Sequence, residues 1–416
     1  MNKRIALLAG VALLCARPAY AETLREAVAA AYAGNPTLAS AHARQDALSE
    51  ETEQARAGGR LTAAIDAGAG YDKFDYGKGG GATVSATLPI WTGGRVPSAV
   101  RAAKADVAAG QQSVRDSEAQ LITDVVGAYA ELLYDQQAVD IAKADIALLD
   151  HQVAEAQARF KLGQATKTDV AQLVAQRASA VATLADAQAT LDMTQASYRA
   201  TVGHDPGVLA PPPEALPALP GTLDQARSRA IADNPQLKAS LRTADASAAR
   251  IDAARANGAP SLGVGANYGY DDNLGNSSIG TFPRATAVSL QLHVPILTGG
   301  LVSSQVRQAS AAHRADLFDA DAALRETTRQ VDSAWAALAS AHAQTEADSG
   351  RVDAADLALK GVRAEYAFAL RSTLEILEAD ESLRAAQLAL ARQRSAALIA
   401  AAALLRATGR LDHESF

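Results

Sequence analysis

The chain carries the same sequence layout twice. Asn35-Pro36 recurs as Asn234-Pro235 at an offset of 199 residues. Farther along, the motif Pro-Ile-x-Thr-Gly-Gly starts at Pro89 and again at Pro295, at an offset of 206 residues. Self-similarity over so long a stretch constrains the fold more than any local pattern, because each copy must form the same set of elements. We therefore expect two structural repeats per chain.

Each copy is predicted to contain the same elements in the same order. A helix of about 35 residues (23–57 and 222–256) comes first, followed by two extended segments, a very long helix, a short turn and a return helix. A proline-rich linker separates the copies. The expected boundaries are a first repeat at 22–203, a linker at 204–221, a second repeat at 222–409 and a C-terminal tail at 410–416.

The first 21 residues have the features of a secretory signal peptide. A basic start at Lys3-Arg4 is followed by an apolar run and by a small-x-small cleavage site that ends at Ala21. Cys15 is the only cysteine, so the mature chain is expected to have neither disulfides nor thiolate metal sites. Without the three basic residues of this segment, 36 basic residues remain against 46 acidic ones. This acidic balance argues against nucleic-acid binding.

Two proline-free regions, 98–205 and 296–416, allow very long helices. A continuous helix from Ser98 to Phe160 would be about 95 Å long. A single helix of that length cannot bury one of its faces against its own chain, so it needs neighbouring helices. Neither region contains the run of about 18 apolar residues expected of a membrane helix. The return helices carry a seven-residue repeat that favours coiled-coil seams, although an ordinary two-helix hairpin fits it as well. The repeated positions are Val170, Arg177, Leu184, Leu191 and Tyr198 in the first copy, and Ile376, Leu383, Leu390, Ala397 and Leu404 in the second.

The extended segments alternate between apolar and small or polar residues. This pattern covers 84–90, 262–270 and 286–296, with polar, Gly-rich loops expected at 72–81 and 271–280. Such alternation predicts half-buried strands, and their length matches a tilted strand that crosses a bilayer. A soluble antiparallel sheet explains the alternation equally well. In a membrane, however, four strands would leave two open edges that lipid cannot hydrogen-bond, so copies of the chain would have to share one barrel.

From Thr23 to Gly409 the sequence resembles the outer membrane efflux protein family, the TolC-like channels. The resemblance rests on the doubled layout, on the Asn-Pro pairs, on Leu88–Gly94 with Val294–Gly300, and on Arg159–Gly163. It implies a mainly α fold with a small β part, in a homotrimer. Each chain would give four strands to a shared 12-stranded β-barrel in outer-membrane lipid, and its helices would build a long α-helical barrel through the periplasm of a Gram-negative bacterium.

The resemblance also implies partners and site residues. The partners are a periplasmic adaptor (membrane fusion) protein and an inner-membrane transporter of the RND, ABC or MFS class. Glu in place of the family's usual Asp, and Ala in place of Gly in the second turn, are departures from the pattern. An ordinary solvated helix face is the alternative role for each acidic residue. The implied residues are Glu375 and Glu378 at a pore constriction, Asp169, Tyr366 and Arg371 at a periplasmic gate, and Gly163 and Ala369 in the tip turns where the adaptor docks.

No pattern in the sequence supports catalysis, a cofactor or a metal site. The seven histidines are scattered without metal-ligand spacing, and the Gly-rich segment 77–81 precedes no helix that could bind phosphate. Two non-enzymatic functions remain. One is a trimeric outer-membrane channel, a passive exit duct of a tripartite efflux or type I secretion system. The other is a soluble periplasmic coiled-coil adaptor, although two equivalent hairpins and only four strands favour the channel.

Overall fold

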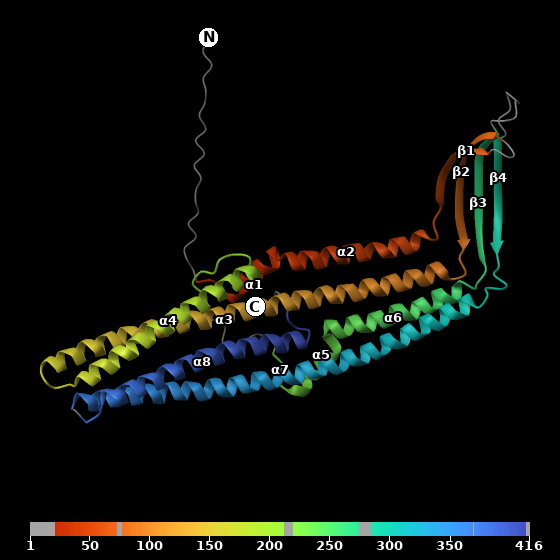
Figure 1. Ribbon diagram of the computed structural model, residues 1–416. Coiled ribbons are helices and arrows are strands. Elements are labelled where there is room, and N and C mark those ends of the chain that lie inside the picture. Colours follow the sequence, from red (N-terminus) through yellow and green to blue (C-terminus); the bar gives the residue numbers. More distant parts are fainter. Residues whose placement is uncertain (1–20, 73–76, 212–218, 274–283, 369, 413–416) are drawn as a thin grey trace, which may run out of the picture.

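The computed structural model describes residues 21–72, 77–211, 219–273, 284–368 and 370–412 (Figure 1). The predicted signal peptide, apart from Ala21, and the tip residue Ala369 lie outside the described residues. The described part is mainly helical with one small sheet, as predicted. The sheet stands at one end of the long helices, and the turns of the two helical hairpins lie at the other end (Figure 1).

The same six elements occur twice along the chain. The offsets between equivalent helices are the 199 and 206 residues seen in the sequence. The first set is α1 (Leu24–Gly34), α2 (Pro36–Ala57), β1 (Thr62–Asp72), β2 (Gly77–Trp91), α3 (Arg95–Lys161) and α4 (Lys167–Val202). The second set is α5 (Leu223–Asp233), α6 (Pro235–Ala256), β3 (Ser261–Asn273), β4 (Arg284–His293), α7 (Leu301–Ala367) and α8 (Thr373–Ala407).

The prediction of one continuous helix over 23–57, and another over 222–256, is wrong. Asn35 is extended, with ψ at 119°, and it ends α1 while capping α2. Its side-chain oxygen accepts a hydrogen bond from the backbone N–H of Thr37 at 2.8 Å. Asn234 caps α6 in the same way. The break follows from the next residue, because proline has no N–H to donate and disfavours a helical residue before it.

The four strands form one antiparallel sheet in the order β1-β2-β3-β4, so β1 and β4 are its edges. Three expected boundaries were wrong. β3 continues to Asn273, so the second predicted loop begins later than 271. Gly77 belongs to β2, because it pairs with Asp72 of β1, so the first predicted loop is shorter than 72–81. β4 ends at His293, so the strand pattern predicted over 286–296 extends too far at its C-terminal end.

The register of the sheet separates an apolar face from a face of small and polar residues. Directly paired residues of antiparallel strands share a face, and neighbours along a strand alternate. The apolar face is uncovered within the chain: Ile65 and Val288 are each 75% exposed. It comprises Ala63, Ile65, Ala67, Ala82, Val84, Ala86, Leu88, Leu262, Val264, Ala266, Tyr268, Val288, Leu290 and Leu292, together with one hydroxyl residue, Thr286. The opposite face includes Thr62, Ala64, Asp66, Thr83, Ser85, Thr87, Pro89, Gly263, Gly265, Asn267, Gly269, Ala287, Ser289 and Gln291.

The long helices α3 and α7 have 67 residues each, so each is about 100 Å long. α4 folds back on α3 and α8 on α7, which gives two helical hairpins, and α3 also packs against α8. All ten heptad positions of the return helices are buried or half-buried, as expected of a helix seam. The main core lies midway along the rods, around Tyr129, Tyr198 and Leu404. A second cluster, here called the lower cluster, consists of Leu149, Ala156, Leu173, Ala180 and Leu377.

α8 is the one described helix that is long and apolar enough to cross a membrane. This finding differs from the expectation that neither proline-free region contains such a segment. This criterion considers only the length and the apolar composition of a helix, and helices buried in the cores of soluble proteins also meet it. In this chain Leu398, Leu404 and Leu405 of α8 are buried in the main core. The apolar character of α8 is therefore explained by packing against other helices.

Candidate functional site at the hairpin turns

The first hairpin turn is closed by Gly163 in the left-handed conformation, with φ at +74°. The N–H of Gly163 donates to the carbonyl of Phe160 at 3.0 Å, and the N–H of Gln164 donates to that of Arg159 at 2.9 Å. This pair of bonds is a Schellman motif, which suits glycine because other residues are strained there. At the second turn the N–H of Leu370 donates to the carbonyl of Glu365 at 3.1 Å.

Two of the predicted site residues, Asp169 and Glu375, cap the N-termini of the return helices α4 and α8. Asp169 accepts hydrogen bonds from the backbone N–H and the hydroxyl of Thr166, both at 2.9 Å. Glu375 accepts the same bonds from Ser372, at 2.7 and 3.0 Å. Each pair is a reciprocal capping box, in which the hydroxyl also accepts from the backbone of the acidic residue. The sequence analysis missed this role, although Thr-x-x-Asp and Ser-x-x-Glu before a helix are its recognised signals.

Arg371 links the two helices of the second hairpin across their turn. Its guanidinium donates to Glu365 at the end of α7, at 2.6 Å, and to Glu375 in α8, at 2.7 Å. The backbone bond from Ser372, and then Arg371, lower the pKa of Glu375 to about 2. The two carboxylates in turn raise the pKa of Arg371. Glu375 therefore stays ionised throughout the neutral and mildly acidic range.

Glu378 differs from Glu375 in its surroundings. Its side chain is exposed, and its carboxylate has no hydrogen-bond or ion-pair partner among the residues that the structure describes. A spacing of three residues places both carboxylates on the same side of α8. The predicted pair thus combines one carboxylate held in a cap with one that is free to interact.

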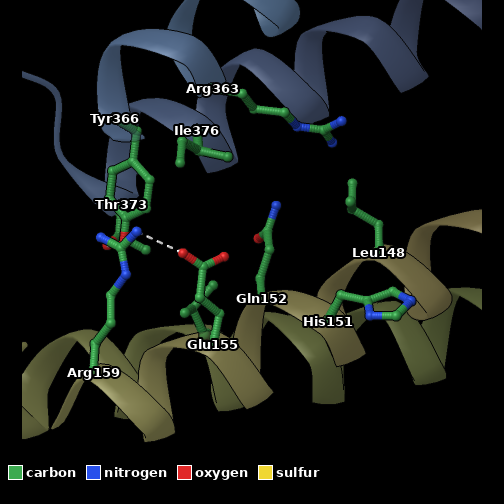
Figure 2. A pocket seen from close by; sticks show the side chains of 10 residues that line it. Leu148, His151, Gln152, Glu155, Arg159, Arg363, Tyr366, Thr373 and Ile376 are labelled. Atoms are coloured by element: carbon green, nitrogen blue, oxygen red, sulfur yellow. Dashed lines mark hydrogen bonds and ion pairs between the residues drawn. The ribbon is translucent and has the colours of Figure 1, made fainter. Parts of the chain in front are cut away.

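Tyr366 of the second hairpin contacts Arg159 of the first hairpin, a residue that was not among the predicted site residues. The guanidinium of Arg159, at the end of α3, lies 4.7 Å from the centre of the Tyr366 ring, in a cation–π contact. Arg159 also pairs with Glu155 at 2.7 Å, and the Tyr366 hydroxyl lies 3.5 Å from that of Thr373 (Figure 2). In the described part of the chain, the hydrogen bonds of Asp169 are with Thr166, and it forms no hydrogen bond or ion pair with Tyr366 or Arg371.

An open groove of about 330 Å³ runs between the hairpins beside this contact (Figure 2). Its lining combines apolar, polar and charged side chains. The residues are Leu148, His151, Gln152, Glu155, Arg159 and Leu173 from the first hairpin, and Arg363, Tyr366, Thr373 and Ile376 from the second. The described residues contain no group of three or more His, Cys, Asp or Glu side chains that could bind a metal ion.

Known proteins resemble this chain over almost its whole length. The family described as outer membrane efflux protein matches residues 27–204 and 226–410. The outer membrane efflux protein BepC of Brucella suis is 30% identical over 97% of this chain and 89% of the relative. The outer membrane protein TolC of Vibrio cholerae is 26% identical over 100% of this chain and 97% of the relative.

Solved structures show the same fold. The outer membrane protein VceC of Vibrio cholerae superposes with a TM-score of 0.77 at 22% identity, covering 93% of this chain and 96% of VceC. A membrane protein from Pseudomonas aeruginosa gives 0.81 at 21% identity, covering 94% of this chain and 91% of that chain. Since the family matches both repeats and a 30% identical relative spans nearly the whole sequence, the chain belongs to the outer membrane efflux protein family.

Proposed function

We propose that three copies of this chain form a passive exit duct in the outer membrane, serving a tripartite efflux or type I secretion system. The observation that carries the proposal is the sheet, which has an uncovered apolar face and two open edges at one end of the long hairpins. Strand directions alternate, so β4 of one copy can pair antiparallel with β1 of the next. Three copies would close a 12-stranded barrel, which removes the edges that lipid cannot satisfy.

The chain is an outer-membrane efflux or secretion channel, not a soluble periplasmic adaptor. The relatives are named as outer membrane proteins or, like the alkaline protease secretion protein AprF of Pseudomonas aeruginosa, as secretion proteins. The family comprises channels, which need no catalytic site of their own. The partners in this proposal are a periplasmic adaptor and an inner-membrane RND, ABC or MFS transporter, which would supply the energy and select the cargo.

The hairpin turns would form the periplasmic entrance of the duct. In a trimer, Glu375 and Glu378 would contribute six carboxylates around one opening. Arg371 and Tyr366 would hold that opening closed, together with Asp169 through contacts between chains. The hairpin turns that contain Gly163 and Ala369 would receive the adaptor. The groove between the hairpins and the shared position of the two turns at the end of the rods support this assignment.

The proposal is tested by isolating the mature protein from membranes. We expect it in the sarkosyl-insoluble outer-membrane fraction, as a detergent-solubilised trimer by cross-linking and light scattering, and we expect it to form pores in planar bilayers. A stable monomer that needs no detergent, or a protein released by osmotic shock, would contradict the proposal.

Replacing both acidic residues, Glu375→Gln with Glu378→Gln, is expected to weaken the channel's preference for cations. Gln can still serve in the capping box, so the helix start is retained while six charges are lost from the trimer. The measurement is the reversal potential in a salt gradient across a planar bilayer. Glu346→Gln removes an exposed charge from the middle of α7 and is the control. Unchanged selectivity in the double variant would contradict the constriction assignment.

Arg371→Ser is expected to loosen the entrance and raise single-channel conductance. The change removes both ion pairs across the α7–α8 turn and leaves Glu365 and Glu375 to repel each other. Arg325→Ser, which breaks an exposed pair with Asp321 within α7, is the matched control and should leave conductance unchanged. Equal conductance in the two variants would show that Arg371 has no part in closure.

A further inference from the structure

A buried cluster of charges joins the two hairpins between the main core and the turns. Arg384 of α8 forms ion pairs with Asp145 of α3 and with Asp380 of α8. The side chains of Arg384, Asp145 and Asp380 are only 15%, 12% and 5% exposed. Arg363 of α7 approaches Asp380 at 3.8 Å, so two arginines face two aspartates.

The two ion pairs of Arg384 differ in what they connect. Asp380 lies four residues before Arg384 in the same helix, so this pair adds nothing between helices. Asp145 lies on the first hairpin, and its pair with Arg384 crosses from one hairpin to the other. Burial lowers the pKa of Arg384 to about 10, so the guanidinium remains charged at neutral pH. A buried charge that loses its partner is strongly disfavoured, so this contact resists separation.

A second ion pair between the hairpins is more exposed to solvent. Arg406 of α8 meets Asp116 of α3 at 3.2 Å, but both side chains are about one-third exposed, and salt and water screen such pairs. Among the described residues, Asp145–Arg384 is the one ion pair between the hairpins with both side chains less than one-fifth exposed. It lies near the lower cluster, where Leu377 is the member from the second hairpin.

We infer that Arg384 is a positioning residue whose pair with Asp145 holds the second hairpin against the first and so sets the separation of the two turns. Neither residue lines the groove or lies in a turn, so the pair acts from outside the proposed entrance. The inference concerns contacts within one chain. Its test therefore does not depend on whether the turns close a pore.

The test uses the absence of cysteine from the mature chain. Leu377→Cys places a thiol at the buried contact between the hairpins, and the rate of its reaction with a maleimide-polyethylene glycol in the purified, assembled protein reports their separation. Adding Asp145→Asn should speed labelling about tenfold, as expected for loss of a coupled pair. Adding Asp380→Asn also removes a buried carboxylate but leaves the pair between the hairpins, so labelling should stay within about twofold.

Two further variants make the result decisive. Asp145→Glu keeps the charge and should label at the parent rate. Ala402→Cys reports on the main core, where Ala402 is fully buried, and should stay unlabelled in every background. Equal labelling of the Asp145→Asn and Asp380→Asn variants would overturn the inference. Labelling of Ala402→Cys in the Asp145→Asn background would also overturn it, because the effect would then be general unfolding.

Discussion

Val288→Arg is expected to abolish assembly of the channel in the outer membrane. Val288 lies in the edge strand β4 on the uncovered apolar face, where its side chain is 75% exposed. If this face contacts lipid, an arginine there costs about 2–4 kcal/mol near the bilayer midplane, and a trimer would carry three. The amount of heat-modifiable trimer in the outer-membrane fraction measures the effect.

Ser289→Arg is the matched control, one residue farther along the same strand. Alternation places Ser289 on the small, polar face, opposite Gly265 of β3. An arginine on a water-filled lumen keeps its hydration, so we expect the trimer to assemble and its conductance or ion selectivity to change. If Ser289→Arg blocked assembly and Val288→Arg did not, the apolar face would point away from lipid and the proposed barrel would be wrong.

Gly409→Ala is expected to cause a large loss of stability, because it combines backbone strain with a steric clash. Gly409 follows α8 with φ at +69°, and a Cβ there would lie 2.4 Å from the carbonyl oxygen of Asp233 and 3.0 Å from the backbone nitrogen of Asn234. The left-handed conformation costs about 1–2 kcal/mol for alanine. Moving the backbone of the α5–α6 junction adds about 1–3 kcal/mol, the usual cost of overpacking.

Gly203→Ala separates these two costs. Gly203 is the equivalent residue of the first repeat, with φ at +99°, but a Cβ there would meet no atom within 4 Å. In Gly203→Ala only the cost of the left-handed conformation remains, so the apparent melting temperature of this variant should fall less than that of Gly409→Ala. Thermal unfolding of the detergent-solubilised trimer, followed by circular dichroism, compares the two. Equal melting temperatures would mean that the end of α8 does not pack against the α5–α6 junction as described.

These predictions draw on features that the sequence reveals to different degrees. The doubled layout could be recognised from motifs that recur 199 and 206 residues apart, and the long helices from the absence of proline. The strands could be recognised from alternation over a few residues. The apolar face of the sheet follows from the same alternation once the register is known. The Asn-Pro break was also readable, since proline at the first helical position after a capping asparagine is a local signal.

The site depended much more on the tertiary structure. Family resemblance pointed to Glu375, Arg371 and Tyr366, but their partners within the chain were not evident from it. The capping role of Glu375 is local and could have been recognised. The contact of Arg159 with Tyr366 joins residues that are far apart in sequence.

By itself, the sequence determined that the chain folds as two copies of a long helical hairpin with paired strands, because periodicity and proline placement act over a few residues at a time. The tertiary structure alone decided which side chains meet between the hairpins. Asp145 and Arg384 lie on different hairpins, and neither is marked by any local pattern. Their meeting depends on how far each helix is rotated about its axis when α3 packs against α8, and that rotation is set by the packing of all the helices together.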